Sequence, residues 1–495
     1  MTADVRPSLT TLTDFQCLSS PIDCATPIVT IDENEVIDVE LADVTVKGEV
    51  FNIPPRYTEC KIVGKGGYGT VIKCIDSFRN RTAAIKKCSK VFPTGLTEQM
   101  MAKQLGQQMS ERAQLFQTLH QCRILREMKV LAHLAHPNVI DLRALIPPKS
   151  YKSFKDVYFV TELMDSDLHN LLASGEKLTD RHIQYVISQI LCALSYIHSA
   201  DIIHRDLKPE NILVNRDCEI KLCDFGLARG LLRENEFERE YVETGTQGYR
   251  APEQLLDVRN MTKSVDMWAV GCIMAELMMG KKLFDGNSPV SQLNQIIGIL
   301  GTPDLSKCKC SDKIIKLIEK MKKVERIPFS QVFEGHNPLA LDLLEKLLMF
   351  DPEQRINAED ALRHPYLSDL FDESSLQVAE KFDFSFEERC LDIISIKREA
   401  FSTILNFSSI NLQKSCSDQF LLSPTGHLPF ERLSSPSLKD RIVSPVVEAT
   451  QKELREMFTT TEEDGDVNTS SIGSPSNFNS GGLVGWISSW FKGRR

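Results

Sequence analysis

Three short motifs between His204 and Glu253 contain side chains suited to phosphate chemistry. The sequence reads HRDLKPEN over residues 204–211, DFG over residues 224–226 and APE over residues 251–253. Transfer of a phosphoryl group needs little covalent help, but it needs a carboxylate that orients the acceptor hydroxyl and positive charge that neutralises the phosphates. The three motifs, in this order and at these spacings, therefore predict a phosphotransfer site.

The first two motifs supply the individual groups. Asp206 is the candidate catalytic base, and Lys208 is placed to meet the γ-phosphate of ATP. Asn211 and Asp224 offer oxygen ligands for Mg²⁺, an ion that keeps several waters and accepts few protein groups. Any one of these motifs alone would usually be ordinary loop sequence, so the prediction depends on their combination.

A glycine-rich segment lies upstream and reads GKGGYGTV over residues 64–71. It joins two predicted strands, residues 57–63 and 70–75, and its glycines let the backbone approach phosphates. The pattern alone also fits a dinucleotide-binding loop or a tight hairpin. A dinucleotide fold would continue into a helix, with an acidic residue roughly 20 positions on, whereas here a β-branched run continues as a strand. The expected phosphate-covering residues are Gly64, Lys65, Gly66, Gly67, Tyr68, Gly69 and Val71.

A further predicted strand contains Ala84 and ends near Lys86, the expected contact of the α- and β-phosphates. The partner of Lys86 should be an acid on a helix. Residues 123–131 have apolar side chains at helical spacing around Glu127. Taken alone, these two charged residues would be ordinary surface residues; with the motifs above, we expect a Lys86–Glu127 ion pair.

Length and composition set the frame for this site. The chain has 495 residues, of which 42% are apolar, so two or three domain-sized units with a substantial core are possible. A net charge of -10 argues against general nucleic-acid binding, which favours clustered basic residues. The 14 cysteines include no Cys-x-x-Cys pair, and the N-terminus lacks a leader-like apolar run, so we expect reduced thiols in a cytoplasmic or nuclear protein.

Both ends of the chain have the composition of tails. Residues 1–50 are expected to form a flexible acidic tail, and residues 405–495, rich in Ser, Thr, Asn and Gly, a disordered one. No apolar run approaches the roughly 20 residues of a transmembrane helix. Residues 482–495 place two Trp and one Phe beside three basic side chains, a pattern that allows weak peripheral membrane contact, a protein contact or docking on the chain's own surface.

Together these segments resemble a eukaryotic protein kinase of the mitogen-activated protein (MAP) kinase family. The resemblance covers about residues 51–404. It includes residues 382–387, FDFSFE, which are similar to the family's C-terminal extension that returns toward the small lobe. The other segments are LRE at 125–127, AHPNVI at 135–140, VTELMDSDL at 160–168, KLCDFGLAR at 221–229, LF at 283–284 and GTP at 301–303.

The resemblance implies an α+β, bilobal protein kinase fold with ATP between the lobes. The small β-rich lobe would span residues 51–162, and the larger helical lobe with the C-terminal extension would span residues 163–404. The connection from Lys86 to Glu127 is longer than the family's usual one, and its surplus near residues 97–120 is helix-prone. This insert is expected to be an extra helix on the small lobe, a partner-binding surface or a solvated insertion.

The resemblance also implies a nucleotide pocket and several structural contacts. It places Thr246 against Asp206 and Lys208, and Asp266 under the His204–Arg205 backbone. It also pairs Glu253 with Arg355. The implied pocket residues are the backbone groups of Glu162 and Met164 for adenine, Thr161 at the back, Asp167 facing the ribose, and Ala84 and Cys223 along the walls. The Cys223 thiol could be inert or reactive, because the sequence does not fix its pKa.

The activation loop departs from the family pattern. Relatives have Thr-x-Tyr in this loop, but residues 239–253 read REYVETGTQGYRAPE, and neither possible alignment recovers the pair. The three arginines that converge on the loop phosphothreonine in the family are present as Arg126, Arg205 and Arg229. Converging arginines without an anion would repel one another. A phosphate on Tyr241 or Thr244, added by an upstream activating kinase or by autophosphorylation, is the expected anion.

The predicted function is a protein serine/threonine kinase that transfers the ATP γ-phosphate to protein substrates in an intracellular MAP-kinase-like cascade. Arg250 matches the arginine that in relatives opens a site for proline after the acceptor, so a Ser/Thr-Pro preference is expected. The alternative from a different class is a catalytically weak pseudokinase scaffold whose tails and insert recruit partners. A cyclin-dependent kinase is disfavoured by the segment that follows Phe382.

Overall fold

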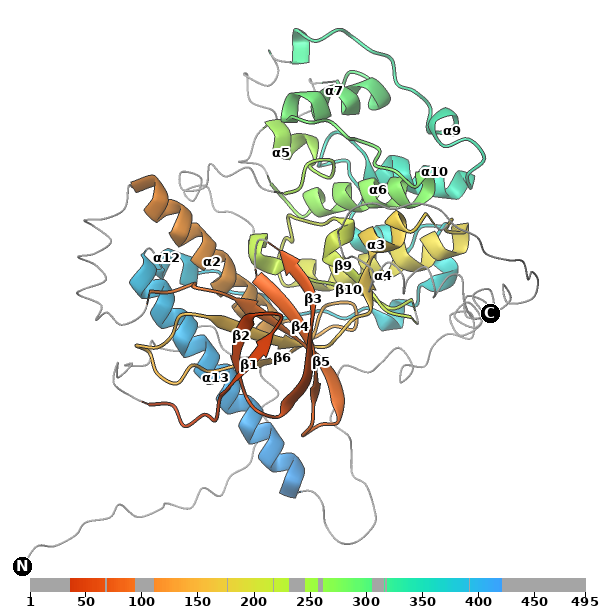
Figure 1. The fold of residues 1–495 in the computed structure, drawn as a ribbon. Coiled ribbons are helices and arrows are strands. Elements are labelled where there is room, and N and C mark those ends of the chain that lie inside the picture. Colours follow the sequence, from red (N-terminus) through yellow and green to blue (C-terminus); the bar gives the residue numbers. More distant parts are fainter. Residues whose placement is uncertain are drawn as a thin grey trace, which may run out of the picture.

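A five-stranded antiparallel sheet forms the centre of the β-rich lobe (Figure 1). The structure, a computed structural model, describes residues 36–66, 69–93, 111–175, 177–216, 218–230, 245–256, 261–304, 316, 318–390 and 392–420. Along the sheet the strands are β3 Tyr57–Gly66, β4 Gly69–Asp76, β5 Arg81–Cys88, β7 Val157–Thr161 and β6 Leu142–Leu145. Side chains alternate between the two faces of a strand. Ile85 is therefore fully buried on one face, whereas Ala84 and Lys86 point to the other.

A β-hairpin that precedes this sheet covers its buried face. Strands β1 Ala42–Val46 and β2 Glu49–Ile53 pair antiparallel, and Phe51 is fully buried in one cluster with Ile85. The turn between them has Lys47 and Gly48 at positive φ, 48° and 81°. Two-residue hairpin turns of this kind match the twist of the flanking strands.

The helix that contains Glu127 is longer than the sequence pattern indicated. Helix α2 spans Glu111–His133. Residues 111–120 of the predicted insert therefore lengthen this helix instead of forming a separate one, and residues 97–110 lie outside the described part of the chain. Its core-facing residues recur at helical spacing: Leu125, Met128 and Leu131.

Helices make up most of the larger lobe. The apolar side chains of α4, Asp180–Ser199, form a buried stripe, and α6, Ser264–Met279, is buried almost throughout. A small sheet of β8 Ser166–Asp167, β9 Ile212–Val214 and β10 Ile220–Leu222 lies under the active site. Among the described residues, the other α-helices of this lobe include α3 Leu168–Ala173, α5 Pro252–Leu256, α7 Pro289–Leu300, α9 Phe329–Val332, α10 Pro338–Leu347 and α11 Ala358–Leu362.

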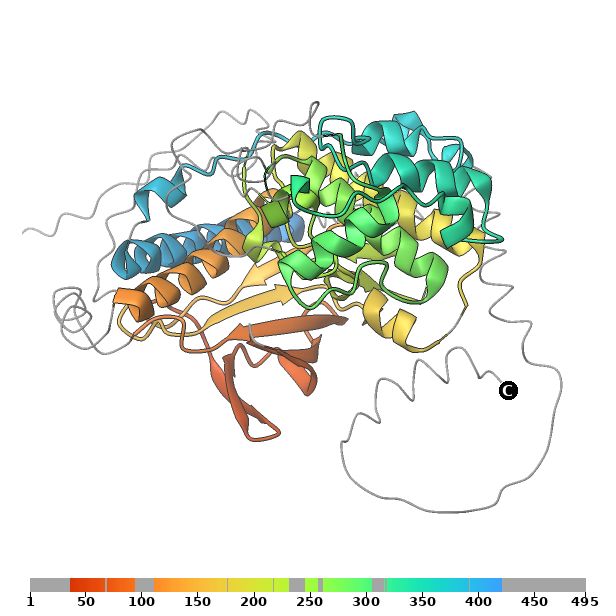
Figure 2. The same ribbon diagram turned by 90° about the horizontal axis from the view of Figure 1, so that it is seen from above.

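The C-terminal extension returns to the β-rich lobe, where its last helix lies beside α2 (Figures 1 and 2). It contains the short helix α12, Phe386–Arg389, and the long helix α13, Ile393–Phe420. Phe401 packs edge-on against Tyr151 with ring centroids 5.4 Å apart. The fully buried Lys397 donates to the carbonyl oxygen of Pro93 at 3.0 Å. The extension is thus part of the core that surrounds α2.

Two predicted boundaries need correction. The expectation of a flexible tail over residues 1–50 is wrong for residues 42–50, because they form the hairpin that covers the sheet. The expectation of disorder over residues 405–495 is wrong for residues 405–420, because helix α13 continues through them. Residues 1–35 and 421–495, including the aromatic-basic segment 482–495, lie outside the described residues. Within the described part, none of the helices has the length and apolar character needed to cross a membrane.

Candidate active site

Asp266 fixes the backbone of the catalytic loop from below, as predicted. Its carboxylate accepts from the backbone N–H of His204 at 2.8 Å and of Arg205 at 2.8 Å, and lies 2.9 Å from Nε2 of His198. Burial alone would raise the pKa of Asp266, but the hydrogen bond and charge of His198, with the other groups around it, hold this pKa below its ordinary value. Arg205 has φ of 69°, a left-handed conformation that is costly for a non-glycine residue. The two backbone hydrogen bonds compensate for this cost.

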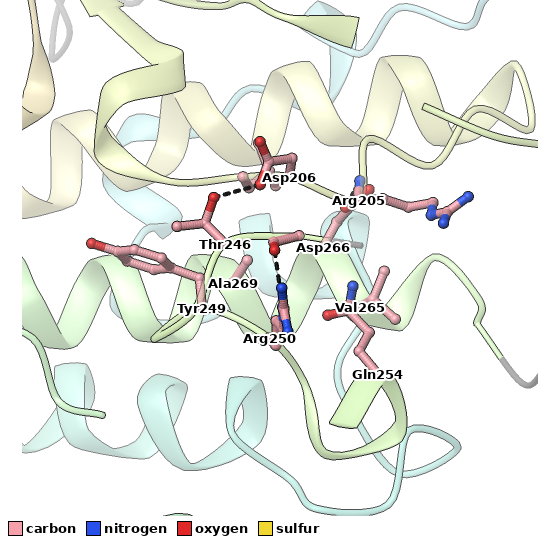
Figure 3. A pocket seen from close by; sticks show the side chains of 11 residues that line it. Arg205, Asp206, Thr246, Tyr249, Arg250, Gln254, Val265, Asp266 and Ala269 are labelled. Carbon is pink, nitrogen blue, oxygen red and sulfur yellow. Dashed lines mark hydrogen bonds between the residues drawn. The ribbon is translucent and has the colours of Figure 1, made fainter. Parts of the chain in front are cut away.

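The catalytic loop presents Asp206 to a pocket, where Figure 3 shows its contact with Thr246. The second carboxylate oxygen of Asp206 lies near Asn211. The Thr246 hydroxyl donates to Oδ1 of Asp206 at 2.7 Å, and Lys208 Nζ donates to the Thr246 oxygen at 3.0 Å. Asn211 Nδ2 donates to the Asp206 carbonyl at 2.8 Å and lies 3.3 Å from Oδ2. These contacts hold the carboxylate of Asp206 in one orientation, which a catalytic base requires.

Lys86 and Glu127 form the expected ion pair between sheet and helix. Lys86 Nζ lies 2.6 Å from Oε1 and 2.8 Å from Oε2 of Glu127. Burial disfavours both charges and raises the pKa of Glu127. Burial also acts to lower the pKa of Lys86, but the Glu127 carboxylate and other nearby acidic groups outweigh it, so that pKa lies above its ordinary value. The short bidentate contact indicates that both groups are ionised.

Asn211 and Asp224 fit the role of Mg²⁺ ligands. The side-chain amide nitrogen of Asn211 is used in donating to Asp206, which leaves its carbonyl oxygen as the group able to bind a cation. Asp224 is held at φ of 62°, and its Oδ1 accepts from the backbone N–H of Gly226 at 3.4 Å. A neutral amide oxygen with one carboxylate suits an ion that shares its coordination with phosphates and waters.

The glycine-rich hairpin is formed by β3 and β4, as the sequence predicted. Gly69 has φ of 138°, and a Cβ at that position would collide with the carbonyl oxygen of Lys87. Glycine is therefore required where the hairpin returns toward β5. The Lys65 Nζ atom lies 3.7 Å from a carboxylate oxygen of Glu49, in the β1–β2 hairpin that covers the sheet. The sequence did not indicate this partner. Two expected phosphate-covering residues, Gly67 and Tyr68, lie outside the described residues.

The expected nucleotide pocket residues line one side of the sheet and the segment that follows it. Val71 of β4 pairs with Lys86 of β5, and Ala84 of β5 pairs with Thr161 of β7. The four residues therefore lie next to one another across three adjacent strands. The Thr161 hydroxyl donates to the carbonyl of Glu162 at 3.0 Å. Met164 follows in the connecting segment and is half-buried. These positions agree with an adenine pocket, whose contacts with ATP stay a prediction.

Asp167 and Cys223 complete the expected pocket. Asp167 caps helix α3 by accepting from the backbone N–H and the side-chain amide of Asn170, each at 2.8 Å. This capping role was not evident from the sequence, although Asp followed by Asn three residues later is a helix-start pattern. Burial, with the nearby Asp224 carboxylate, raises the pKa of Cys223 above its ordinary value. An inert thiol is the better interpretation of Cys223.

The segment after Thr246 is attached to the larger lobe by several polar contacts. Arg250 Nε donates to the Gly245 carbonyl at 2.9 Å, and the Arg250 carbonyl accepts from Gln292 Nε2 at 3.0 Å. Gln292 also accepts from the backbone N–H of Gly248 at 3.1 Å. Gly248 has φ of 96°, a conformation that favours glycine. This segment is therefore a fixed surface beside the catalytic base.

Two of the three arginines that were expected to bind a loop phosphate, Arg126 and Arg229, share an acidic partner in the C-terminal extension. Arg126 Nε lies 2.6 Å from Oε1 of Glu387, and one Arg229 nitrogen lies 3.3 Å from the same oxygen. Glu387 is the last residue of the FDFSFE segment, and the sequence does not indicate this contact. The expected phosphate acceptors, Tyr241 and Thr244, lie outside the described residues.

Comparison with known proteins agrees with this geometry. Residues 57–367 match the protein kinase domain family. The chain is 41% identical over 354 residues to mitogen-activated protein kinase 3 of Arabidopsis thaliana, an alignment that covers 71% of this chain and 89% of the relative. The chain belongs to the MAP-kinase-like branch of the eukaryotic protein kinase family.

Two further relatives support the assignment of this MAP-kinase-like protein. The chain is 40% identical over 385 residues to mitogen-activated protein kinase HOG1B of Wallemia ichthyophaga, covering 77% of this chain and 95% of the relative. It is also 40% identical over 360 residues to mitogen-activated protein kinase 4 of Oryza sativa subsp. japonica, covering 72% and 91% respectively. The bilobal fold and the activity of an ATP-dependent serine/threonine protein kinase in MAP kinase signalling follow from this membership.

Proposed function

We propose that this kinase transfers the γ-phosphate of ATP, with Mg²⁺, to serine or threonine residues that precede proline in protein substrates of the cytoplasm or nucleus. The observation that supports the chemistry best is the hydrogen-bonded chain from Lys208 through Thr246 to Asp206. The Lys86–Glu127 ion pair supplies the second half of the site from the opposite lobe.

Each of these residues has one role in the proposed reaction. Asp206 orients the substrate hydroxyl and takes its proton as the new O–P bond forms and the bond to the β-phosphate breaks. Lys208, held by Thr246, neutralises charge on the transferred group. Lys86 binds the α- and β-phosphates in the orientation set by Glu127. Bound Mg²⁺, held by Asn211 and Asp224, would neutralise the phosphate oxygens.

The preference for proline rests on the surface beside Thr246. The Arg250 side chain donates a hydrogen bond to the Gly245 carbonyl. This bond occupies a backbone acceptor that would otherwise attract the N–H group of a substrate residue. A residue without a backbone N–H is then the best fit after the acceptor, and proline is the residue that lacks this donor. A peptide library with the position after the acceptor randomised tests this directly. Equal turnover for proline and alanine at that position would contradict the preference.

The proposed activity and the pseudokinase alternative make opposite predictions for one variant. Asp206→Asn keeps the size of the side chain but removes the base, so phosphate transfer should fall by about a hundredfold or more. Asp201→Asn is the matched control, because the Asp201 carboxylate pairs with Lys263 and Lys381, neither of which is a proposed catalytic residue. A scaffold would show no transfer that depends on Asp206.

Tyr241 and Thr244 are proposed acceptors of a regulatory phosphate, from an upstream kinase or by autophosphorylation.

A further inference from the structure

Glu387 lies at the meeting point of two arginines from different parts of the kinase. Its Oε1 is 2.6 Å from Arg126 Nε and 3.3 Å from an Arg229 nitrogen. Arg126 is almost completely buried, with 1% of its surface exposed, whereas the Glu387 side chain is about a quarter exposed. A buried guanidinium that lost its acidic partner would be strongly unfavourable. The carboxylate of Glu387 is therefore the group that makes this arrangement stable.

The two arginines connect Glu387 to the catalytic machinery. Arg126 also donates to the carbonyl of Gly226 at 2.5 Å, next to the metal-binding Asp224. The backbone of Arg229 pairs with Ile203, one residue before the catalytic loop, through hydrogen bonds of 2.7 and 2.9 Å. Through Arg126 and Arg229, one carboxylate oxygen of Glu387 thus links helix α2, the segment after Asp224 and the start of the catalytic loop.

The rest of the C-terminal extension holds the same helix. Lys129 of α2 lies 2.6 Å from Glu399, and its ammonium group is 5.1 Å from the centre of the Phe386 ring. His133, at the end of α2, contacts the carbonyl of Glu380 at 2.9 Å. The extension therefore contacts α2 over several turns. Glu127, the partner of Lys86, follows Arg126 directly, so a shift of α2 would move it away from Lys86.

We propose that Glu387 is a built-in counter-anion that positions α2, so that this kinase is competent without a phosphate on its activation loop. The proposal rests on the proposed function, because it concerns the regulation of the same site. A carboxylate has half the charge of a phosphate and fewer acceptor positions. One oxygen of the Glu387 carboxylate nevertheless contacts both Arg126 and Arg229. A loop phosphate on Tyr241 or Thr244 would then add to the activity and would not be required for it.

The experiment uses the full chain with the loop acceptors removed. In a phosphatase-treated Tyr241→Phe/Thr244→Ala background, the substitution Glu387→Gln removes the charge and keeps the shape. Charge-assisted hydrogen bonds are worth about 1.5–3 kcal/mol, so we expect kcat/KM to fall by about tenfold to a hundredfold. ATP affinity should fall as well, because Lys86 loses its orientation. The matched control is Glu388→Gln, which removes the same charge from the neighbouring exposed side chain and should leave both values unchanged.

Two further measurements separate positioning from general stability. Added acetate should restore part of the activity of Glu387→Ala, because a small carboxylate can occupy the vacated position. Amide hydrogen exchange should accelerate in α2 of Glu387→Gln while exchange in α4 and α6 stays unchanged. Unchanged kcat/KM, ATP affinity and α2 exchange in Glu387→Gln would overturn the proposal.

The remaining outcomes distinguish failure of the Glu387 proposal from failure of the proposed function. If the loop double variant is inactive while phosphorylated wild-type kinase is active, the loop phosphate is the required anion and the proposal fails. If neither protein shows transfer that depends on Asp206, the proposed function fails. ATP affinity and α2 exchange then still decide whether Glu387 positions the helix.

Discussion

Thr246 donates its hydroxyl to the catalytic Asp206 at 2.7 Å, although 40 positions separate the two residues. The same hydroxyl oxygen accepts from Lys208 at 3.0 Å. Thr246, in the activation segment, thereby fixes the Asp206 carboxylate relative to the Lys208 ammonium group. This contact makes Thr246 a structural part of the site and a poor acceptor for a regulatory phosphate, because phosphorylation would place negative charge against Asp206.

The first prediction follows from this contact. Thr246→Ala should lower kcat by about tenfold or more, because loss of the hydrogen bond frees both Asp206 and Lys208. Thr246→Ser, which keeps the hydroxyl, should retain most of the activity, and Thr246→Glu should be nearly inactive. Steady-state kinetics with a peptide substrate measure all three. A serine variant as slow as the alanine variant would show that the hydroxyl contact is unimportant.

The second prediction concerns the ion pair between the lobes. Lys86→Met should remove nearly all turnover, because Lys86 is the proposed contact of the ATP phosphates. The fold should persist with a lower unfolding temperature, because Glu127 loses its buried cation. Lys73→Met is the control, because Lys73 lies exposed on the neighbouring strand β4. Phosphate transfer and thermal unfolding should be measured on both. Turnover at the wild-type rate in Lys86→Met would sink the assignment of the nucleotide site.

The Lys86–Glu127 pair was predictable because a lysine at the end of a strand and an acid on a following helix are both visible in the sequence. The Asp266 hydrogen bonds and the Thr246 contact were predicted only through the resemblance to MAP kinases. The hairpin before the sheet was missed, although its signal was present. Residues 42–53 alternate in burial around the Lys47–Gly48 turn, but their acidic surroundings suggested a tail.

The partner of Arg126 could not be predicted in this way. Arg126 and Glu387 are 261 positions apart, and their contact depends on the path of the whole C-terminal extension across α2. The sequence required an acid near the arginines, because converging positive charges are unfavourable. It could not tell a carboxylate from the extension from a phosphate on the loop. The packing of α12 and α13 against α2 brings Glu387 to Arg126, a contact that the sequence does not display.

The third prediction concerns the thiol of Cys223, next to Asp224, the proposed Mg²⁺ ligand. Burial and the charge of Asp224 raise the pKa of Cys223, so its reactive thiolate is less populated near neutral pH than in an unfolded chain. Alkylation of Cys223 by iodoacetamide at pH 8 should be at least about tenfold slower in the native kinase than in urea. Raising the pH from 8 to 9 should speed the native reaction by a larger factor than the unfolded one, because the thiol of the unfolded chain, with a pKa of about 8.5, is already partly ionised at pH 8. Site-resolved mass spectrometry measures both rates, and equal native and unfolded rates would contradict the assignment of an inert thiol.

The fourth prediction tests the buried ion pair that joins α5 to the end of the larger lobe. Arg355 lies 2.7 and 3.1 Å from the two oxygens of Glu253, and its side chain is fully buried. Glu253→Gln leaves this guanidinium without a compensating charge, and such a loss costs about 3–5 kcal/mol of unfolding free energy. The control is Glu359→Gln, which breaks an exposed contact with Arg363 of 3.6 Å and should cost about 1 kcal/mol or less.

Urea unfolding of both variants at pH 7 gives the comparison. Replacement of both partners by methionine should recover only part of the loss, because Arg355 also donates to the backbone carbonyls of Ser264 and Met349 at 2.6 and 2.9 Å. Those carbonyls would be left buried without a donor, at a cost that the apolar side chains do not offset. A Glu253→Gln variant as stable as Glu359→Gln would mean that water reaches Arg355 and that the pair does not anchor α5 to the larger lobe.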